Sequence, residues 1–135
     1  MKRFLLDTGI GGDFIDRRRG VYEHARNEVA QGNRVGIGIP VLAELVYGLE
    51  RSTSRDLNMH SLRTALSAWR VWPFDIKAAF EYGHLAAELK RIGRPMQQVD
   101  IMVAAIALSL GNCSVVTADS DLAAVPNSSV ENWAI

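Results

Sequence analysis

The chain has one cysteine and no long hydrophobic run. Cys113 cannot form an internal disulfide, which favours a reducing compartment such as the cytoplasm. The longest apolar stretch, residues 101–110, is about half as long as a transmembrane helix. The first residues resemble the start of a signal peptide, but the charge of Asp7 makes the apolar part too short. The sequence therefore predicts a cytoplasmic protein without a membrane-spanning segment.

A net charge is also lacking, because 15 lysines and arginines balance 15 aspartates and glutamates. No overall field therefore draws the chain towards nucleic acid, and any attraction for a polyanion has to be local. The ordinary interpretation of each short basic run is a solvated helix end. The candidate RNA-binding residues in these runs are Arg17, Arg18, Arg19, Arg51 and Arg94.

The remaining composition is that of an ordinary globular protein, with 48% hydrophobic and 22% charged residues. A length of 135 residues is enough to bury a core, and we find no internal repeat, linker or low-complexity tract. We expect one domain that covers residues 1–135.

Short apolar runs alternate with segments of helical length and pattern along the chain. Three glycines at positions 9, 11 and 12 are predicted to form a turn before the first helix. Short strands separated by helices predict a three-layer α/β/α sandwich with a central parallel β-sheet. The predicted strands are residues 3–6, 35–39, 71–74, 114–117 and 130–133. The predicted helices are residues 13–19, 22–30, 40–49, 55–69, 76–92 and 99–110, with a helical turn at 119–124.

Four acidic residues stand where carboxylates are unusual. Asp7 and Asp119 each follow a short apolar run. Asp100 opens a long apolar helix, and Glu44 lies inside another, on or beside its buried stripe. Carboxylates avoid such surroundings unless something compensates the charge. Because parallel strands end at one edge of a sheet, Asp7 and Asp119 are expected to meet there.

Each acid taken alone has an ordinary explanation. Asp7 and Asp119 suit the capping of a turn, and Asp100 suits the amino-terminal end of a helix. Glu44 is harder to explain, because no sure cationic partner lies within one helical turn. A divalent metal ion explains all four, since Mg²⁺ and Mn²⁺ prefer carboxylate and water oxygens. The three histidines are scattered, so no Cys/His set is spaced for zinc. We therefore predict a metal site that activates water to attack a phosphodiester.

Five segments follow one another in order, and the four acids in them are separated by 37, 56 and 19 residues. The segments are FLLDT at residues 4–8, VLAELVYG at 41–48, VDIMVAA at 99–105, VVTAD at 115–119 and VENW at 130–133. In these segments, and over nearly its whole length, the chain resembles the PIN-domain ribonucleases, and among them the VapC toxins of bacterial toxin–antitoxin pairs. The first segment alone is a weak signal, whereas the ordered set is a strong one.

The resemblance implies an endoribonuclease that depends on Mg²⁺ or Mn²⁺ and cleaves RNA, often tRNA or ribosomal RNA. The implied catalytic residues are Asp7, Glu44, Asp100 and Asp119. Asp7 and Asp100 would bind the metal ion, and the other two acids would act directly or through water. Thr8 and Thr117 would hydrogen-bond the carboxylates or the attacking water, although both also suit the turn after a strand.

The resemblance also implies a homodimer and a small VapB-like antitoxin, which together form a heterotetramer or a larger assembly. An antitoxin arginine would reach into the acids in place of the metal ion. We expect residues 55–69 to be core or a dimer face and, with the helix at 22–30 and residues 45–49, to line the antitoxin groove. Trp69 and Trp72 are expected to be buried rather than to stack on RNA bases.

Three positions depart from the pattern of the relatives. Gly9 and Val99 stand where many relatives carry asparagine, and a hydrogen bond near the first acid is therefore missing. Asp121 competes with Asp119 for the fourth acidic role, although the spacing from Thr117 favours Asp119. These departures bear on metal affinity or cleavage preference and leave the core ligands in place.

The sequence leaves two other functions open. Asp7-Thr8-Gly9 resembles the active-site triplet of the retroviral-type aspartic proteases, but that fold is almost all β and much of this chain is predicted to be helical. A PIN-like domain that binds RNA or protein without catalysis would keep the same fold, and metal-dependent activity separates it from the enzyme. The sequence does not specify the RNA target or the number of metal ions.

Overall fold

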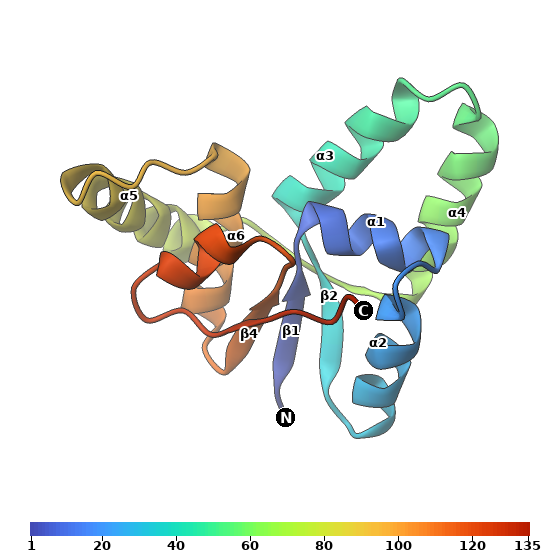
Figure 1. Ribbon diagram of the computed structural model, residues 1–135, viewed down its shortest axis with the longest axis horizontal. Helices are drawn as coiled ribbons and strands as arrows, with labels where there is room; N and C mark the ends of the chain where they lie inside the picture. The colour runs from blue at the N-terminus through green and yellow to red at the C-terminus, as the bar shows by residue number, and fades with distance from the viewer.

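The centre of the computed structural model, which describes all 135 residues, is a five-stranded parallel β-sheet (Figure 1). Its strand order is β3-β2-β1-β4-β5. The strands are β1 (Arg3–Leu6), β2 (Arg34–Gly38), β3 (Arg70–Trp72), β4 (Cys113–Val116) and β5 (Val130–Glu131). Strands β1 and β4 are neighbours, and Leu6 is paired with Val116 at their carboxyl ends.

Helices cover both faces of the sheet (Figure 1). One layer contains α1 (Thr8–Asp16), α2 (Val21–Ala30), α3 (Ile39–Glu50) and α4 (Arg55–Ala68). The other contains α5 (Ile76–Arg91) and α6 (Gln98–Leu110), and a short 3-10 helix, η1 (Ser120–Ala124), follows β4. This arrangement confirms the predicted α/β/α sandwich. No helix is both long enough and apolar enough to cross a membrane.

Apolar side chains from the three layers form one core. Leu5 and Leu6 of β1 and Ile106 of α6 are fully buried within it. Burial of an aliphatic side chain contributes about 1.5–3 kcal/mol to stability. The helix α6 has buried residues along most of its length, as its nearly all-apolar sequence predicts. The core therefore fixes the ends of the strands and helices on which the acidic residues lie.

The first helix begins earlier than the sequence predicts. The helix α1 starts at Thr8, because the carboxylate of Asp7 accepts a hydrogen bond from the amide of Ile10 (2.8 Å) and caps it. The three glycines that follow Thr8 are therefore helical, and the predicted turn is wrong. The helix ends at Asp16, where Arg17 adopts the left-handed conformation with φ of 55°. The predicted helical stretch up to residue 19 is therefore also wrong.

Other boundaries differ by less. Ile39, predicted to end the second strand, instead begins α3, and residues 73–74 lie outside β3. The last strand is shorter than predicted and ends at Glu131, and the ring of Trp133 packs on Phe4, with 5.1 Å between the ring centroids. Trp69 forms the carboxyl-terminal cap of α4 rather than its last turn.

Candidate active site

The predicted acids come from four elements that end or begin at one edge of the sheet (Figure 1). Asp7 directly follows β1, and Thr117 directly follows β4, with Asp119 two residues later. Glu44 lies in the second turn of α3, which begins directly after β2. Asp100 lies in the first turn of α6. The carboxyl edge of the sheet is where open α/β folds bind their ligands.

The carboxyl group of Asp100 reports how closely the acids gather. Burial raises its pKa most, and the negative charges of neighbouring carboxylates raise the pKa further. In decreasing order of effect, these charges belong to Asp119, Asp7, Glu44 and Asp121. The structure therefore places the other three predicted acids close enough for their charges to act on Asp100, and Asp121 joins them.

Asp7 is the most buried of these acids, with 9% of its surface exposed. Burial raises the pKa of its carboxyl group, and the charges of Asp119 and Asp13 act in the same direction. Hydrogen bonds from Thr117 and from the amide of Ile10 oppose this rise, because they stabilise the ionised form. The carboxylate of Asp7 is therefore held in one orientation between two strands of the core.

Glu44 is exposed, which corrects the expectation that it lies on or beside the buried stripe of its helix. The buried side of α3 is made by Val41 and Leu45, and Glu44 faces solvent beside them. Its carboxylate accepts a hydrogen bond of 2.5 Å from the hydroxyl of Thr8. Thr8, the first residue of α1, thus orients the carboxylate of Glu44 on α3. It does so in addition to its position in the turn after β1.

The segment after β4 holds two acids in a turn. The hydroxyl of Thr117 accepts a hydrogen bond from the amide of Asp119 (2.9 Å). The carboxylate of Asp119 in turn accepts one from the amide of Asp121 (2.9 Å) and caps η1. The ordinary capping role of Asp119 is therefore real, and it coexists with the closeness of its charge to Asp100. Both Asp119 and Asp121 are exposed.

No lysine or arginine forms an ion pair with any of these five carboxylates. Their negative charge is therefore uncompensated within the chain. A cavity of about 420 Å³ opens beside them, a size that suits a small ligand or one nucleotide. It is lined by Pro95, Met96, Gln97, Asp100, Asp119 and Asp121.

The arginine run after α1 lies at the opposite end of that helix from Asp7. Arg19 pairs with Asp13 (2.7 Å), and Arg17 stacks over the ring of Tyr22 (3.9 Å). Arg18 contacts two acids of the same helix. The chain therefore uses all three arginines in local contacts.

The other two candidate arginines differ in position. Arg51 directly follows α3 and lies over the ring of Tyr47 (4.9 Å). Arg94 follows α5 and precedes Pro95, which lines the acidic cavity. The side chain of Arg94 is exposed and forms no ion pair. Of the five candidate arginines, Arg94 is the one that is adjacent in sequence to a residue of the acidic cavity, Pro95.

Two departures from the relatives also lie beside the acids. A Cβ atom added to Gly9 would lie 3.8 Å from Oδ1 of Asp7, so a larger side chain has room near that carboxylate. Val99 directly precedes Asp100, and with Glu44 it lines a shallow, largely apolar pocket. Both positions thus border the site without closing it.

Comparison with known proteins identifies the family. The family model described as PIN domain matches residues 4–127. A VapC2 ribonuclease of Rickettsia felis is 30% identical over 130 residues, which cover 96% of this chain and 97% of that protein. A tRNA(fMet)-specific endonuclease VapC of Salmonella typhimurium is 31% identical over 134 residues, with 98% and 99% covered. The chain belongs to the PIN domain family, in its VapC group.

Solved structures agree with this assignment. VapBC2 from Rickettsia felis, solved bound to a DNA fragment from the promoter, contains a chain with a TM-score of 0.90 and 30% identity. The match covers 97% of the present PIN-domain chain and 98% of that chain. The family predicted from the acidic segments, and ribonuclease as its class of activity, are confirmed. The protease hypothesis is wrong, because a parallel α/β sandwich is not the almost all-β fold that it requires.

Proposed function

We propose that the chain is a metal-dependent endoribonuclease and the toxin of a toxin–antitoxin pair. Asp7 and Asp100 would bind Mg²⁺ or Mn²⁺, with Glu44 and Asp119 acting directly or through water. The observation that carries this proposal is the convergence of these acids at the carboxyl edge of the sheet, where none of them forms an ion pair with a lysine or arginine. The raised pKa of Asp100, caused by burial and by the neighbouring carboxylates, supports it. Uncompensated carboxylates at one site are stable only with protons or a cation.

The donor set fits a hard divalent ion. It consists of carboxylate and hydroxyl oxygens and contains no thiol or imidazole, which matches the preference of Mg²⁺ and Mn²⁺. When bound, such an ion supplies Lewis-acid chemistry that polarises the phosphate and acidifies a water. The open cavity beside Asp100 and Asp119 gives the phosphate of an RNA strand access to these oxygens.

The neighbouring residues of the chain would orient the acids. Ile10 donates to Asp7 through its amide, and Thr8 donates to Glu44 through its hydroxyl. The hydroxyl of Thr117 accepts a hydrogen bond from the amide of Asp119 and also hydrogen-bonds Asp7. Thr117 therefore links the carboxyl ends of β1 and β4. Orientation of this kind reduces the reorganisation that a metal site needs when it binds its ion. We expect Asp121 to contribute negative charge to the site rather than a direct ligand.

RNA is the substrate class that the relatives support. The relative from Salmonella typhimurium is named as specific for tRNA(fMet), and we propose tRNA as the first substrate to test. Arg94 is the proposed contact to the RNA backbone, because it is exposed, forms no ion pair and directly precedes Pro95, which lines the acidic cavity. Action on RNA, together with the single Cys113, also supports a location in the cytoplasm.

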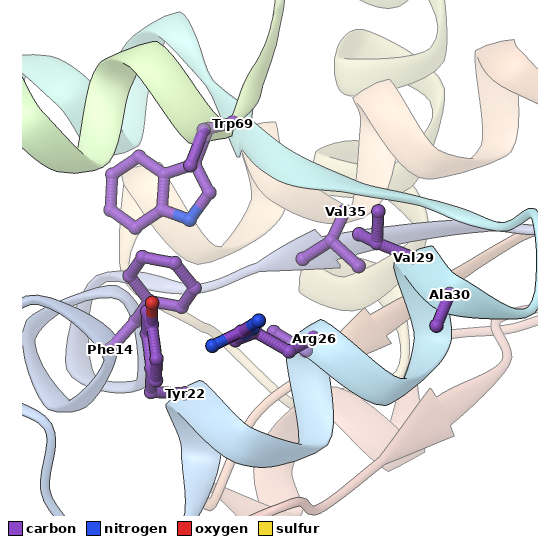
Figure 2. Close-up of a pocket in the computed structure, with 9 residues that line it drawn as sticks. Phe14, Tyr22, Arg26, Val29, Ala30, Val35 and Trp69 are labelled. Atoms are coloured by element: carbon purple, nitrogen blue, oxygen red, sulfur yellow. The ribbon is translucent and has the colours of Figure 1, made fainter.

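An antitoxin would bind at a pocket formed by residues of α1, α2, β2 and the end of α4. Figure 2 shows this pocket, of about 360 Å³, with Tyr22 and Arg26 of α2 on one side and Trp69 on another. Trp69 is buried, and its Nε1 has no hydrogen-bond partner within the chain. The predicted residues 45–49 do not line the pocket. Its lining is Phe14, Tyr22, Ala25, Arg26, Val29, Ala30, Val35, Ala68 and Trp69.

The partner assignment rests on the relatives together with this pocket. The Rickettsia felis structure is a VapBC complex, so we propose a VapB-like antitoxin for this chain as well. A homodimer of the toxin, and a heterotetramer or larger assembly with the antitoxin, belong to the same proposal. The antitoxin would inhibit by placing an arginine among the uncompensated acids.

Metal binding tests the proposal separately from catalysis. We would titrate Mn²⁺ by calorimetry into wild type, Asp100→Asn and Asp16→Asn, and measure cleavage of tRNA by the same samples. Asp16 is an exposed acid that pairs with Arg18, so its variant controls for the loss of one carboxylate. We expect Asp100→Asn alone to lose both affinity and cleavage. Equal Mn²⁺ affinity in all three proteins would contradict the assigned site.

A further inference from the structure

A second cluster of metal-ligating side chains lies outside the acidic site. His24 and Glu28 are one turn apart on α2, and Glu131 comes from β5. One ligand atom from each of the three residues lies within 4.8 Å of the other two. Nε2 of His24 is 3.5 Å from the carboxylate of Glu28. The sequence analysis missed this group, because Glu131 is at the far end of the chain from His24.

Neighbouring side chains hold these ligands in place. The indole of Trp133 stacks on the imidazole of His24, with 4.2 Å between the ring centroids and 10° between the planes. The indole N–H of Trp133 also donates to Oε1 of Glu131 (3.1 Å). The side-chain amide of Asn33 donates through Nδ2 to Oε1 of Glu28 (3.0 Å). Each carboxylate thus has one oxygen fixed by a neutral donor, which is the arrangement that orients ligands around bound metal ions.

The charge around the three residues is negative. Two carboxylates and an imidazole face only one cationic group, Nζ of Lys2, which is 3.5 Å from Glu131. Glu28 has no lysine or arginine partner, although only 15% of its side chain is exposed. The ordinary interpretation is a polar contact between His24 and Glu28, one turn apart on one helix. That contact explains neither the approach of Glu131 nor the two neutral donors that orient the carboxylates.

We propose that His24, Glu28 and Glu131 bind a divalent transition-metal ion such as Zn²⁺ or Ni²⁺. Imidazole nitrogen with carboxylate oxygen suits these ions, whereas Mg²⁺ prefers oxygen ligands alone. Water would complete the coordination, because the ligand side chains remain partly exposed. The ion would join α2 to the last strand. Because α2 also forms a wall of the pocket in Figure 2, the ion would stiffen that wall.

Trp133 gives this site a built-in reporter. A paramagnetic ion held by His24 lies against the stacked indole, so Ni²⁺ or Co²⁺ should quench part of the tryptophan emission. We would titrate Ni²⁺ into the full chain without a histidine tag and compare wild type with His24→Gln and Glu131→Gln. Loss of a ligand should weaken the apparent affinity by on the order of tenfold or more. Asn33→Ala, which removes a donor to Glu28, should weaken it by a smaller factor.

Two controls separate this site from others. His84→Gln removes a second histidine that lies one turn from a glutamate on α5, and Asp100→Asn alters the acidic site. Both should leave the quenching of tryptophan emission by Ni²⁺ unchanged, because it reports the ion beside Trp133, provided that circular dichroism shows all variants folded. The proposal is overturned if wild type does not bind Ni²⁺, if His24→Gln and Glu131→Gln both bind as well as wild type, or if His84→Gln abolishes binding. None of these outcomes depends on ribonuclease activity.

Discussion

At the scale of single residues, the ionised carboxyl groups of Asp7 and Asp100 lower the stability of the fold, although the proposed metal site needs them ionised. Both have pKa values raised chiefly by burial, and both lie among other negative charges. A raised pKa means that the folded chain holds these protons more tightly than the unfolded chain does. Without a metal ion the charged acids therefore destabilise the fold, and a bound cation relieves that penalty.

The first prediction concerns the pH dependence of Asp100. Because the folded state binds its proton more tightly, the stability contributed by this group falls as pH rises from the ordinary aspartate value of 3.8 through the raised pKa. Asp100→Asn should therefore melt at a higher temperature than wild type in EDTA, by a margin that grows as pH rises above 3.8 and levels off above the raised pKa. Thermal unfolding at several pH values measures this margin.

Added Mg²⁺ supplies the control for this measurement. Mg²⁺ should raise the melting temperature of wild type and leave that of Asp100→Asn nearly unchanged. The difference in melting temperature between the two proteins should therefore narrow or change sign. If Asp100→Asn is instead less stable than wild type in EDTA at neutral pH, the charge of Asp100 is compensated by something other than a metal ion.

The second prediction concerns Thr8, which donates to Glu44. Thr8→Val removes the donor and keeps the shape, so Glu44 loses its orientation. We expect the rate of RNA cleavage, the affinity for the metal ion, or both to fall about 10–100-fold, as is typical for a group that orients a metal ligand. Thr8→Ser keeps a hydroxyl and should recover most of the activity. Equal loss in both variants would indicate that Thr8 acts through packing and not through its hydroxyl.

At the scale of helices and strands, the sequence predicted which elements exist better than where they begin. The order of strands and helices is as predicted, because long apolar and amphipathic runs decide it. The start of α1 was missed, because glycines after Asp7 suggested a turn while the side chain of Asp7 caps a helix. The exposure of Glu44 was missed, because an apolar sequence does not show which residues of α3 face α1.

A third prediction separates two kinds of glycine. A methyl group at Gly36 of β2 would overlap the backbone of Arg70 on the adjacent strand. Gly36→Ala should therefore lower the free energy of unfolding by at least about 2 kcal/mol. Gly48 of α3 has open space around its Cβ position, and Gly48→Ala should raise the free energy by about 0.5–1 kcal/mol. Denaturant unfolding compares the two, and a neutral Gly36→Ala would contradict the tight spacing of β2 and β3.

At the scale of the whole molecule, the strand order brings acids from distant segments to one sheet edge. The family motifs allowed Asp7, Glu44, Asp100 and Asp119 to be proposed from the sequence. The closeness of Asp121 to Asp100, and of Glu131 to His24, needed the structure, because neither follows from spacing along the chain. The apolar surface of α5 was also not foreseen.

The fourth prediction is that the exposed apolar surface of α5 forms the interface of the proposed homodimer. Ile76 and Phe80 lie one turn apart on α5 and are 78% and 79% exposed, which is unusual for large apolar side chains on a free surface. Phe80→Glu should convert a dimer into a monomer in sedimentation or light-scattering measurements. Leu57→Glu on α4, where Leu57 is 68% exposed, is the matched control and should leave the dimer intact. The opposite pattern would assign the dimer face to α4, the alternative raised by the sequence.

The central claim is that the gathered acids catalyse metal-dependent cleavage of RNA, and one assay tests it most directly. Purified wild type and Asp7→Asn would be incubated with total RNA in Mg²⁺, in Mn²⁺ and in EDTA. Asparagine keeps the cap of α1, so the variant should fold and isolate the loss of one charge. We predict cleavage by wild type that requires the metal ion and disappears in Asp7→Asn. Cleavage by Asp7→Asn at the rate of wild type would contradict the claim.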